Sequence, residues 1–94
     1  MKRALNRYNV AYFMPVQTGY GSTALDFIVC VNGKYVEIET KQPGKHPTPR
    51  QELRMDEIIE AGGAVFVVGE EYDEDTKMFS GEAELNAWLK HAQP

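Results

Sequence analysis

The chain has 94 residues, of which 43% are hydrophobic and 26% are charged, and its formal net charge is −4 at pH 7. This length fits one domain, residues 1–94, and so small a domain would gain buried area by self-association. No apolar run approaches the roughly 20 residues of a membrane span, and no signal segment begins the chain, so we expect a cytoplasmic protein without membrane contact.

The charges are unevenly distributed along the chain. Residues 1–54 carry eight Lys or Arg and four acids, whereas residues 55–94 carry two and ten. Such an asymmetry is compatible with one face that attracts a polyanion and another that repels it, although acidic segments are more often plain solvated surface.

The first half of the chain predicts a short helix and three strands. Residues 2–9 form a marginal basic helix, and residues 10–17 contain Pro15, which is typical of an edge or broken strand. The loop TGYGST has too few glycines for a phosphate-binding motif. LDFIVCV is expected to be a strand buried on both faces, and Asn32-Gly33 is a strong two-residue turn that makes KYVEIETK antiparallel to it.

The single cysteine lies inside this apolar strand. One cysteine excludes an intrachain disulfide, and Cys30 is expected to be a small buried side chain in a reducing compartment. This agrees with the cytoplasmic location expected from the missing signal segment.

The helix expected after the proline-rich loop QPGKHPTP has clear end signals. Thr48, a proline at the first helical position and Gln51 three residues on make a capping box. The helix should therefore run over about 49–61 and end at Gly62-Gly63.

The C-terminal third predicts a strand and a last helix. AVFVV is a short buried strand, EEYDEDTK is a polar loop, and Ser80 is expected to cap a helix with apolar residues at Leu85, Trp88 and Leu89. The element order α-β-β-β-α-β-α predicts an α/β fold with a mixed β-sheet flanked by helices.

The stretch VEIETK places three charges on one side of its strand. Side chains alternate between the faces of a strand, so Glu37, Glu39 and Lys41 share one face. Two interpretations are open: a solvated face of an antiparallel sheet, or a strip that binds a metal ion.

The hairpin register brings a further carboxylate to this strip. A two-residue turn at Asn32-Gly33 places Asp26 opposite Glu39, with β-carbons roughly 4.5–5.5 Å apart. Like charges so placed repel unless a divalent cation lies between them, and Mg²⁺ prefers one or two carboxylates and several waters. An ammonium on Lys41 could then stabilise charge on a phosphate, which favours phosphodiester hydrolysis.

These residues carry a resemblance to a known group of nucleases. LDFIV followed by IETK, PTPRQ and AGGAVFVV resembles the PD-(D/E)XK nuclease superfamily, and more narrowly the small stand-alone VRR-Nuc domains of phages and prophages. The match covers about residues 10–68. The resemblance implies a restriction-endonuclease-like sheet and a bacterial host cell of phage or prophage origin.

The resemblance also implies roles for individual residues. Asp26 and Glu39 would hold Mg²⁺ or Mn²⁺ together with the backbone carbonyl of Thr40. Lys41 would be the catalytic lysine, and Gln51 the helix glutamine that borders the site.

Two positions depart from the family pattern. Leu25 stands where a proline usually precedes the aspartate, and residues 1–25 contain no acid where many relatives have a helix glutamate. A one-metal site, or an acid supplied by a neighbouring subunit, therefore stays open.

Other polar residues have structural as well as functional interpretations. Gln51 is explained by the capping box, yet its spacing with Met55 and Ile58 points it toward the sheet, and both roles can coexist. Glu37 is expected to be supporting or solvated. The residues expected to contact nucleic acid are Lys45, Arg50 and Arg54, through phosphates, and Tyr20, through base stacking.

Three functions remain open from the sequence. The first is a Mg²⁺- or Mn²⁺-dependent, structure-selective DNA endonuclease that acts as a homodimer on branched or junction DNA, similar to a Holliday-junction resolvase. The alternative is a catalytically silent nucleic-acid-binding or assembly module that keeps the nuclease fold. The third is a plain α+β interaction domain whose charged strand is a solvated edge.

Overall fold

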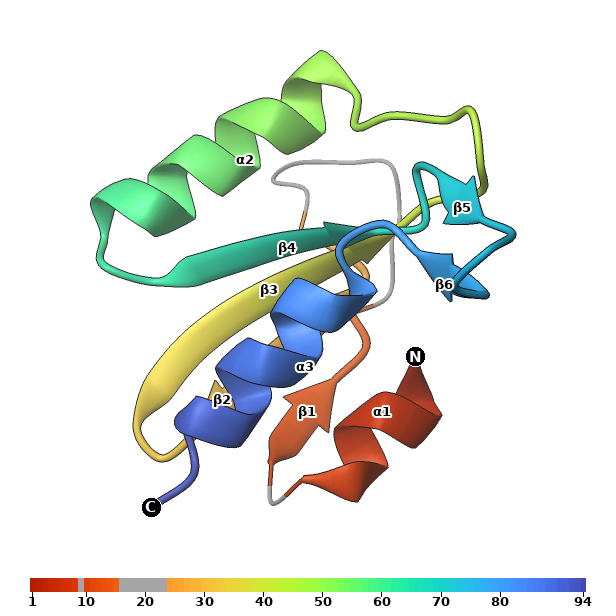
Figure 1. Ribbon diagram of the computed structural model, residues 1–94. Helices are drawn as coiled ribbons and strands as arrows, with labels where there is room; N and C mark the ends of the chain where they lie inside the picture. The colour runs from red at the N-terminus through yellow and green to blue at the C-terminus, as the bar shows by residue number, and fades with distance from the viewer. Residues whose placement is uncertain (9, 16–23) are drawn as a thin grey trace.

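The computed structural model describes residues 1–8, 10–15 and 24–94 and shows a mixed α/β fold (Figure 1). Within this part of the chain, no helix is long and apolar enough to cross a membrane. The elements are α1 (Lys2–Arg7), β1 (Ala11–Phe13), β2 (Phe27–Val31), β3 (Lys34–Thr40), α2 (Pro49–Glu60), β4 (Ala64–Val68), β5 (Tyr72–Asp73), β6 (Met78–Phe79) and α3 (Glu82–His91).

The main sheet has four strands in the order β1-β2-β3-β4. The first three strands are antiparallel, and β4 is parallel to β3. The turn between β2 and β3 has positive φ at both Asn32 (49°) and Gly33 (76°), as a tight hairpin turn with the right-handed strand twist requires. Val31 pairs with Lys34, so the register predicted from this turn is confirmed.

Helices cover both faces of the sheet, and the apolar core lies on one of them. In Figure 1, α2 lies on one side of the sheet and α1 and α3 on the other. Burying strand residues against α1 and α3 removes their apolar area from water, which is the main force that stabilises the domain. The buried core residues are Leu5, Phe27, Val29, Val31, Val36, Ile38, Val68, Leu85, Leu89 and Ala92.

The opposite face is covered only in part, and this corrects two predictions. Helix α2 packs against β3 and β4, so β2 alternates between buried and less buried residues and is not buried on both faces. Cys30 belongs to the face beyond α2 and is exposed, contrary to the expected burial. The apolar composition of β2 could not reveal which strands α2 covers.

The signals at both ends of α2 are confirmed. Thr48 Oγ1 accepts a hydrogen bond from the Gln51 N–H at 3.2 Å, and Gln51 Oε1 accepts one from the Thr48 N–H at 2.9 Å. The helix ends at Glu60, close to the expected boundary. β1 is an edge strand that ends before Pro15, also as expected.

The segment after β4 differs from the prediction. EEYDEDTK is not a plain loop, because β5 and β6 pair as a hairpin in which the Tyr72 and Phe79 rings lie 4.9 Å apart. Ser80 does not cap α3: its hydroxyl accepts a hydrogen bond from the Glu71 N–H, and the cap residue is Gly81. A Cβ on Gly81 would lie 2.1 Å from the Val67 carbonyl oxygen, so glycine is required there.

Candidate active site

The acidic strip of β3 is buried beneath α2. Glu37 is fully buried and Glu39 is 4% exposed, although both carry carboxylates. Buried carboxylates are costly unless hydrogen bonds or opposite charges hold them. The interpretation of this strip as a solvated strand face is therefore wrong. The hypothesis of a plain interaction domain is based on that interpretation and loses its support.

Asp26 lies just before β2 and is fixed to the end of β3. Its Oδ2 accepts hydrogen bonds from the Thr40 N–H at 2.9 Å and from the Thr40 hydroxyl at 2.7 Å. The Asp26 N–H in turn donates to Glu39 Oε1 at 3.3 Å. The hairpin register thus brings Asp26 and Glu39 together, as the sequence predicted.

Glu39 receives the other two candidate residues. Its Oε2 accepts a hydrogen bond from Gln51 Nε2 at 2.6 Å and lies 3.3 Å from Lys41 Nζ. Burial and the nearby charge of Asp26 raise the pKa of Glu39 above its usual range, and the lysine offsets this only in part. The cluster of Asp26, Glu39 and Lys41 thus contains two carboxyl groups and one ammonium.

The position of Lys41 is set by a glycine that the sequence analysis did not single out. The Lys41 N–H donates to the Val68 carbonyl at 2.8 Å, and Gly69 follows with a φ of 113°. A Cβ on Gly69 would lie 1.9 Å from the Lys41 carbonyl oxygen. Only glycine permits this close approach of the two backbones.

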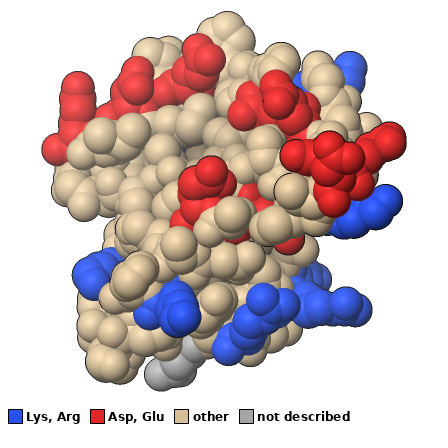
Figure 2. All heavy atoms as spheres, viewed as in Figure 1, with Lys and Arg blue, Asp and Glu red and all other residues tan. Residues whose placement is uncertain are grey.

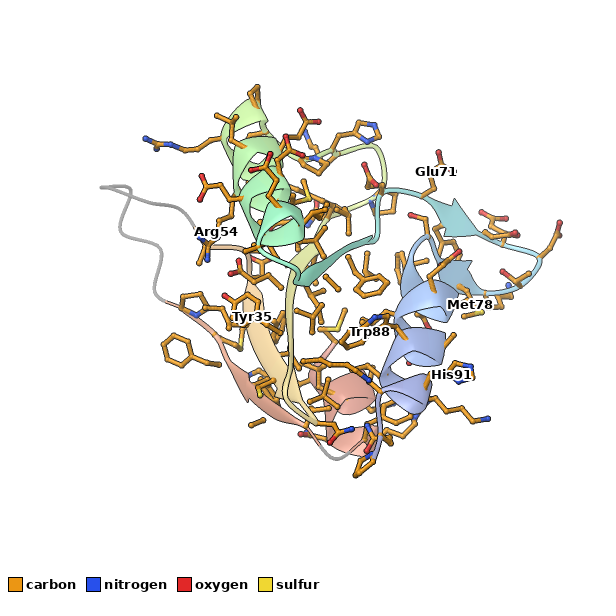
Figure 3. The ribbon with its side chains drawn as sticks, turned by 90° about the vertical axis from the view of Figure 1, so that its left-hand side faces the viewer. Tyr35, Arg54, Glu71, Met78, Trp88 and His91 are labelled. Carbon is orange, nitrogen blue, oxygen red and sulfur yellow. The ribbon has the colours of Figure 1, made fainter. Side chains whose placement is uncertain are left out.

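Glu37 forms a second network on the same face. It accepts two hydrogen bonds from Arg54, at 2.6 and 3.3 Å, one from the Tyr35 hydroxyl, and one from the Leu25 N–H at 3.0 Å. Figure 3 shows Arg54 and Tyr35 on the same side of the sheet, and Trp88 on the side of α3. Because Leu25 precedes Asp26, this network also holds the backbone that presents the aspartate.

The network sets the charge of Glu37. Burial alone would raise the pKa of Glu37, but the hydrogen bonds from Arg54, Tyr35 and the Leu25 N–H outweigh it and lower the pKa. Sequence reasoning missed the pairing of Glu37 with Arg54. The available signal was the position of Arg54 three residues after Gln51, on neighbouring positions of the helix surface.

The donor atoms fit a hard divalent cation that keeps much of its water. Within the described ranges, no group of three or more His, Cys, Asp or Glu side chains is placed to hold a metal. Asp26 and Glu39 supply two carboxylates, and no hydrogen bond within the described residues engages Asp26 Oδ1. One or two carboxylates are the usual protein share of a Mg²⁺ site. Thr40 is adjacent, through its contacts with Asp26.

Three of the residues expected to contact nucleic acid lie in α2 and in the loop before it. Lys45 and Arg50 are exposed, in the loop before α2 and in its first turn. Arg54 is bound to Glu37 and is 28% exposed. Tyr20 lies outside the described residues.

The chain was compared with known proteins. No protein-family model, curated protein or solved structure matches it.

Proposed function

We propose that this protein is a metal-dependent DNA endonuclease of the PD-(D/E)XK type, with a restriction-endonuclease-like sheet and a VRR-Nuc-like site. The observation that carries the proposal is the cluster of Asp26, Glu39, Lys41 and Gln51 at one end of β3. Glu39 contacts the Asp26 backbone, the Lys41 ammonium and the Gln51 amide, and two acids with a nearby ammonium suit metal-dependent phosphodiester hydrolysis.

Each residue has a distinct task in this proposal. Asp26 and Glu39 hold Mg²⁺ or Mn²⁺, with the backbone carbonyl of Thr40 as a further ligand. When bound, the ion supplies Lewis-acid chemistry and lowers the pKa of its water. Lys41 stabilises negative charge on the phosphate. Gln51 holds the Glu39 carboxylate in place through its 2.6 Å hydrogen bond.

A cleavage assay tests the proposal. Duplex, flap and four-way-junction DNA are incubated with Mg²⁺ or Mn²⁺, and we expect metal-dependent cutting of at least one branched substrate. Lys41→Ala and Asp26→Asn should each reduce the rate about a hundredfold or more, as for other lost charge-stabilising groups. Lys34→Ala and Asp56→Asn make the same changes at exposed positions and should leave the rate unchanged.

Two results of this assay would contradict the proposal. Absence of metal-dependent cutting on all three substrates rejects the endonuclease. Equal cutting by the site variants and their matched controls rejects the assignment of the site.

A second candidate is a catalytically silent nucleic-acid-binding or assembly module. It is favoured by the internal pairing of the cluster, in which Lys41 lies 3.3 Å from Glu39 and Thr40 binds Asp26. This module would bind DNA in a gel-shift measurement at low salt but release no cleaved product with either metal.

We further propose that the endonuclease acts as a homodimer, because two-fold symmetry supplies two sites for two strands. Analytical ultracentrifugation at micromolar concentration, with and without junction DNA, measures the mass. A monomer under both conditions would contradict the dimer.

A further inference from the structure

A cleft lies beside the candidate site, between α1, the ends of β3 and β4, β6 and the start of α3. Its volume is about 370 Å³. This lies within the range of roughly 300–1,000 Å³ that is usual for ligand sites. Thr40 and Lys41 line the cleft and also contact Asp26 and Glu39, so cleft and candidate site are neighbours.

The rim of the cleft is basic. Arg3 and Arg7 line it from α1, where a spacing of four residues places both on one face of the helix. Both are exposed, and within the part of the chain that the structure describes neither forms an ion pair. Figure 2 shows basic side chains gathered over α1 and acidic ones over α2 and the β5–β6 hairpin. The rim therefore attracts anions.

The walls of the cleft add an aromatic ring and an unsatisfied amide. Phe79 of β6 is 41% exposed and borders the cleft. Asn86 of α3 also lines it, and its Oδ1 is buried without a hydrogen-bond partner among the described residues. A buried acceptor of this kind is costly unless a donor reaches it. Glu82, the acid in the lining, accepts a hydrogen bond from the Phe79 N–H at 3.2 Å.

We propose that this cleft binds a single-stranded segment of nucleic acid. Arg3 and Arg7 hold backbone phosphates, a base stacks on Phe79, and an amino group of a base donates a hydrogen bond to Asn86 Oδ1. Cationic groups that follow the backbone, combined with an aromatic ring that stacks a base, are the usual means of binding single strands. An anionic peptide would also use the two arginines, and competition with polyglutamate distinguishes it from a single strand.

The cleft also limits which DNA structures the proposed endonuclease would prefer as substrates. This step rests on the proposed function: Thr40 and Lys41, at the end of β3, border both the cleft and the candidate site, so we infer that a single strand bound in the cleft continues around this end of the sheet to Glu39. The preferred substrate is then DNA with a single-stranded arm, such as a flap, over a fully paired four-way junction.

Binding is measured without metal, in EDTA, and in the Asp26→Asn background, so that cleavage plays no part. The probes are fluorescently labelled oligo-dC and oligo-dT, followed by anisotropy over a salt series. Removing both arginines, in Arg3→Gln with Arg7→Gln, should weaken binding about tenfold at low salt. It should also reduce the slope of log affinity against log salt by about 1.4, since each single-strand phosphate contact contributes about 0.7.

Matched variants distinguish binding in the cleft from nonspecific electrostatic attraction of the probe to the protein surface. Lys2→Gln with Lys90→Gln removes two exposed charges that do not line the cleft, and this pair should bind nearly as the parent does. Phe79→Leu should weaken binding to both probes about tenfold without changing the salt slope. Asn86→Leu should weaken oligo-dC more than oligo-dT, because thymine has no amino group.

Three outcomes would reject the proposal that the cleft binds a single strand. They are equal effects of the two double variants, no binding of either probe by the parent, and equal displacement of the probe by polyglutamate of matched charge. If wild-type protein cuts DNA but the arginine variant binds as the parent does, the proposed role of the cleft is rejected and the proposed endonuclease function is retained. If no DNA is cut but the arginine variant loses binding, the proposed endonuclease function is rejected and the proposed role of the cleft is retained.

Discussion

Glu37 and Glu39 lie two residues apart on one face of β3, yet their environments shift their pKa values in opposite directions. Burial acts on both, but Glu37 also receives hydrogen bonds from Arg54 and Tyr35, which favour its ionised form. Glu39 has Asp26 as a neighbour and a single ammonium at 3.3 Å. Glu37 is thus a stable structural anion, whereas Glu39 holds a charge that lacks full compensation.

Replacing Arg54 tests the structural role of Glu37. Arg54→Ala leaves a fully buried carboxylate without its cation, and such losses cost about 3–5 kcal/mol of unfolding free energy. We expect about 3 kcal/mol at pH 7, the lower end, because Arg54 is itself 28% exposed. Urea-induced unfolding measures the change.

The pH dependence of this loss has a defined sign. The pKa of Glu37 is lower in the fold than its ordinary value of 4.5, so its ion pair stabilises the fold above that value. The stabilisation is lost as the pH falls through the lower folded pKa, and the difference between wild type and Arg54→Ala should shrink there. A difference that is constant from pH 7 to pH 3 would contradict the role given to this pair.

At the scale of elements, α2 does two things with one residue. Gln51 completes the capping box with Thr48 and also donates to Glu39 Oε2 through its Nε2. The amide has one acceptor and two donor hydrogens, so both contacts form at once. The N-terminus of α2 is therefore fixed relative to the acidic strip, and the cap is part of the architecture of the site.

The two roles of Gln51 can be separated by changing its capping partner. Thr48→Ala removes the hydroxyl that accepts from the Gln51 N–H but keeps the bond from Gln51 Nε2 to Glu39. We expect a loss of about 1 kcal/mol in unfolding free energy, as for other N-cap residues, with cleavage within about threefold of wild type. Gln51→Ala should lower both stability and cleavage. If Thr48→Ala abolished cleavage in folded protein, the site would depend on the cap and not on the amide.

At the scale of the whole molecule, a domain of 94 residues has little stability to spare. Small domains bury a modest fraction of their surface, and unfolding free energies are typically about 5–15 kcal/mol. A raised pKa means that the fold favours protonated Glu39, so its ionised form opposes folding at neutral pH. This cost is relieved as the pH falls toward the ordinary value of 4.5.

A bound divalent cation should relieve the same cost at neutral pH. We expect Mn²⁺ or Mg²⁺ to raise the unfolding temperature by several degrees, since a ligand at a hundred times its Kd adds about 2.7 kcal/mol. Glu39→Gln should remove this metal effect, whereas Glu57→Gln, at an exposed position, should keep it. Calorimetric melting with and without metal provides the measurement. A full metal effect in Glu39→Gln would show that the ion binds elsewhere.

The sequence by itself determined the local geometry of this protein. Asn32-Gly33 imposed the hairpin register that brings Asp26 to Glu39, and Thr48 with Gln51 fixed the start of α2. Such features rest on backbone dihedrals and on hydrogen bonds between residues close in the chain. They can therefore be derived without knowing what packs against them.

Only the tertiary structure decided what covers each face of the sheet. Because α2 lies over β3 and β4, Glu37 and Glu39 are buried and Cys30 is exposed. The same packing pairs Arg54 with Glu37 across 17 positions of the chain, and Arg3 and Lys41 line one cleft. The charge and hydropathy of a side chain determine the free-energy cost of burying it. Whether it is buried depends on contacts between elements that are distant in sequence.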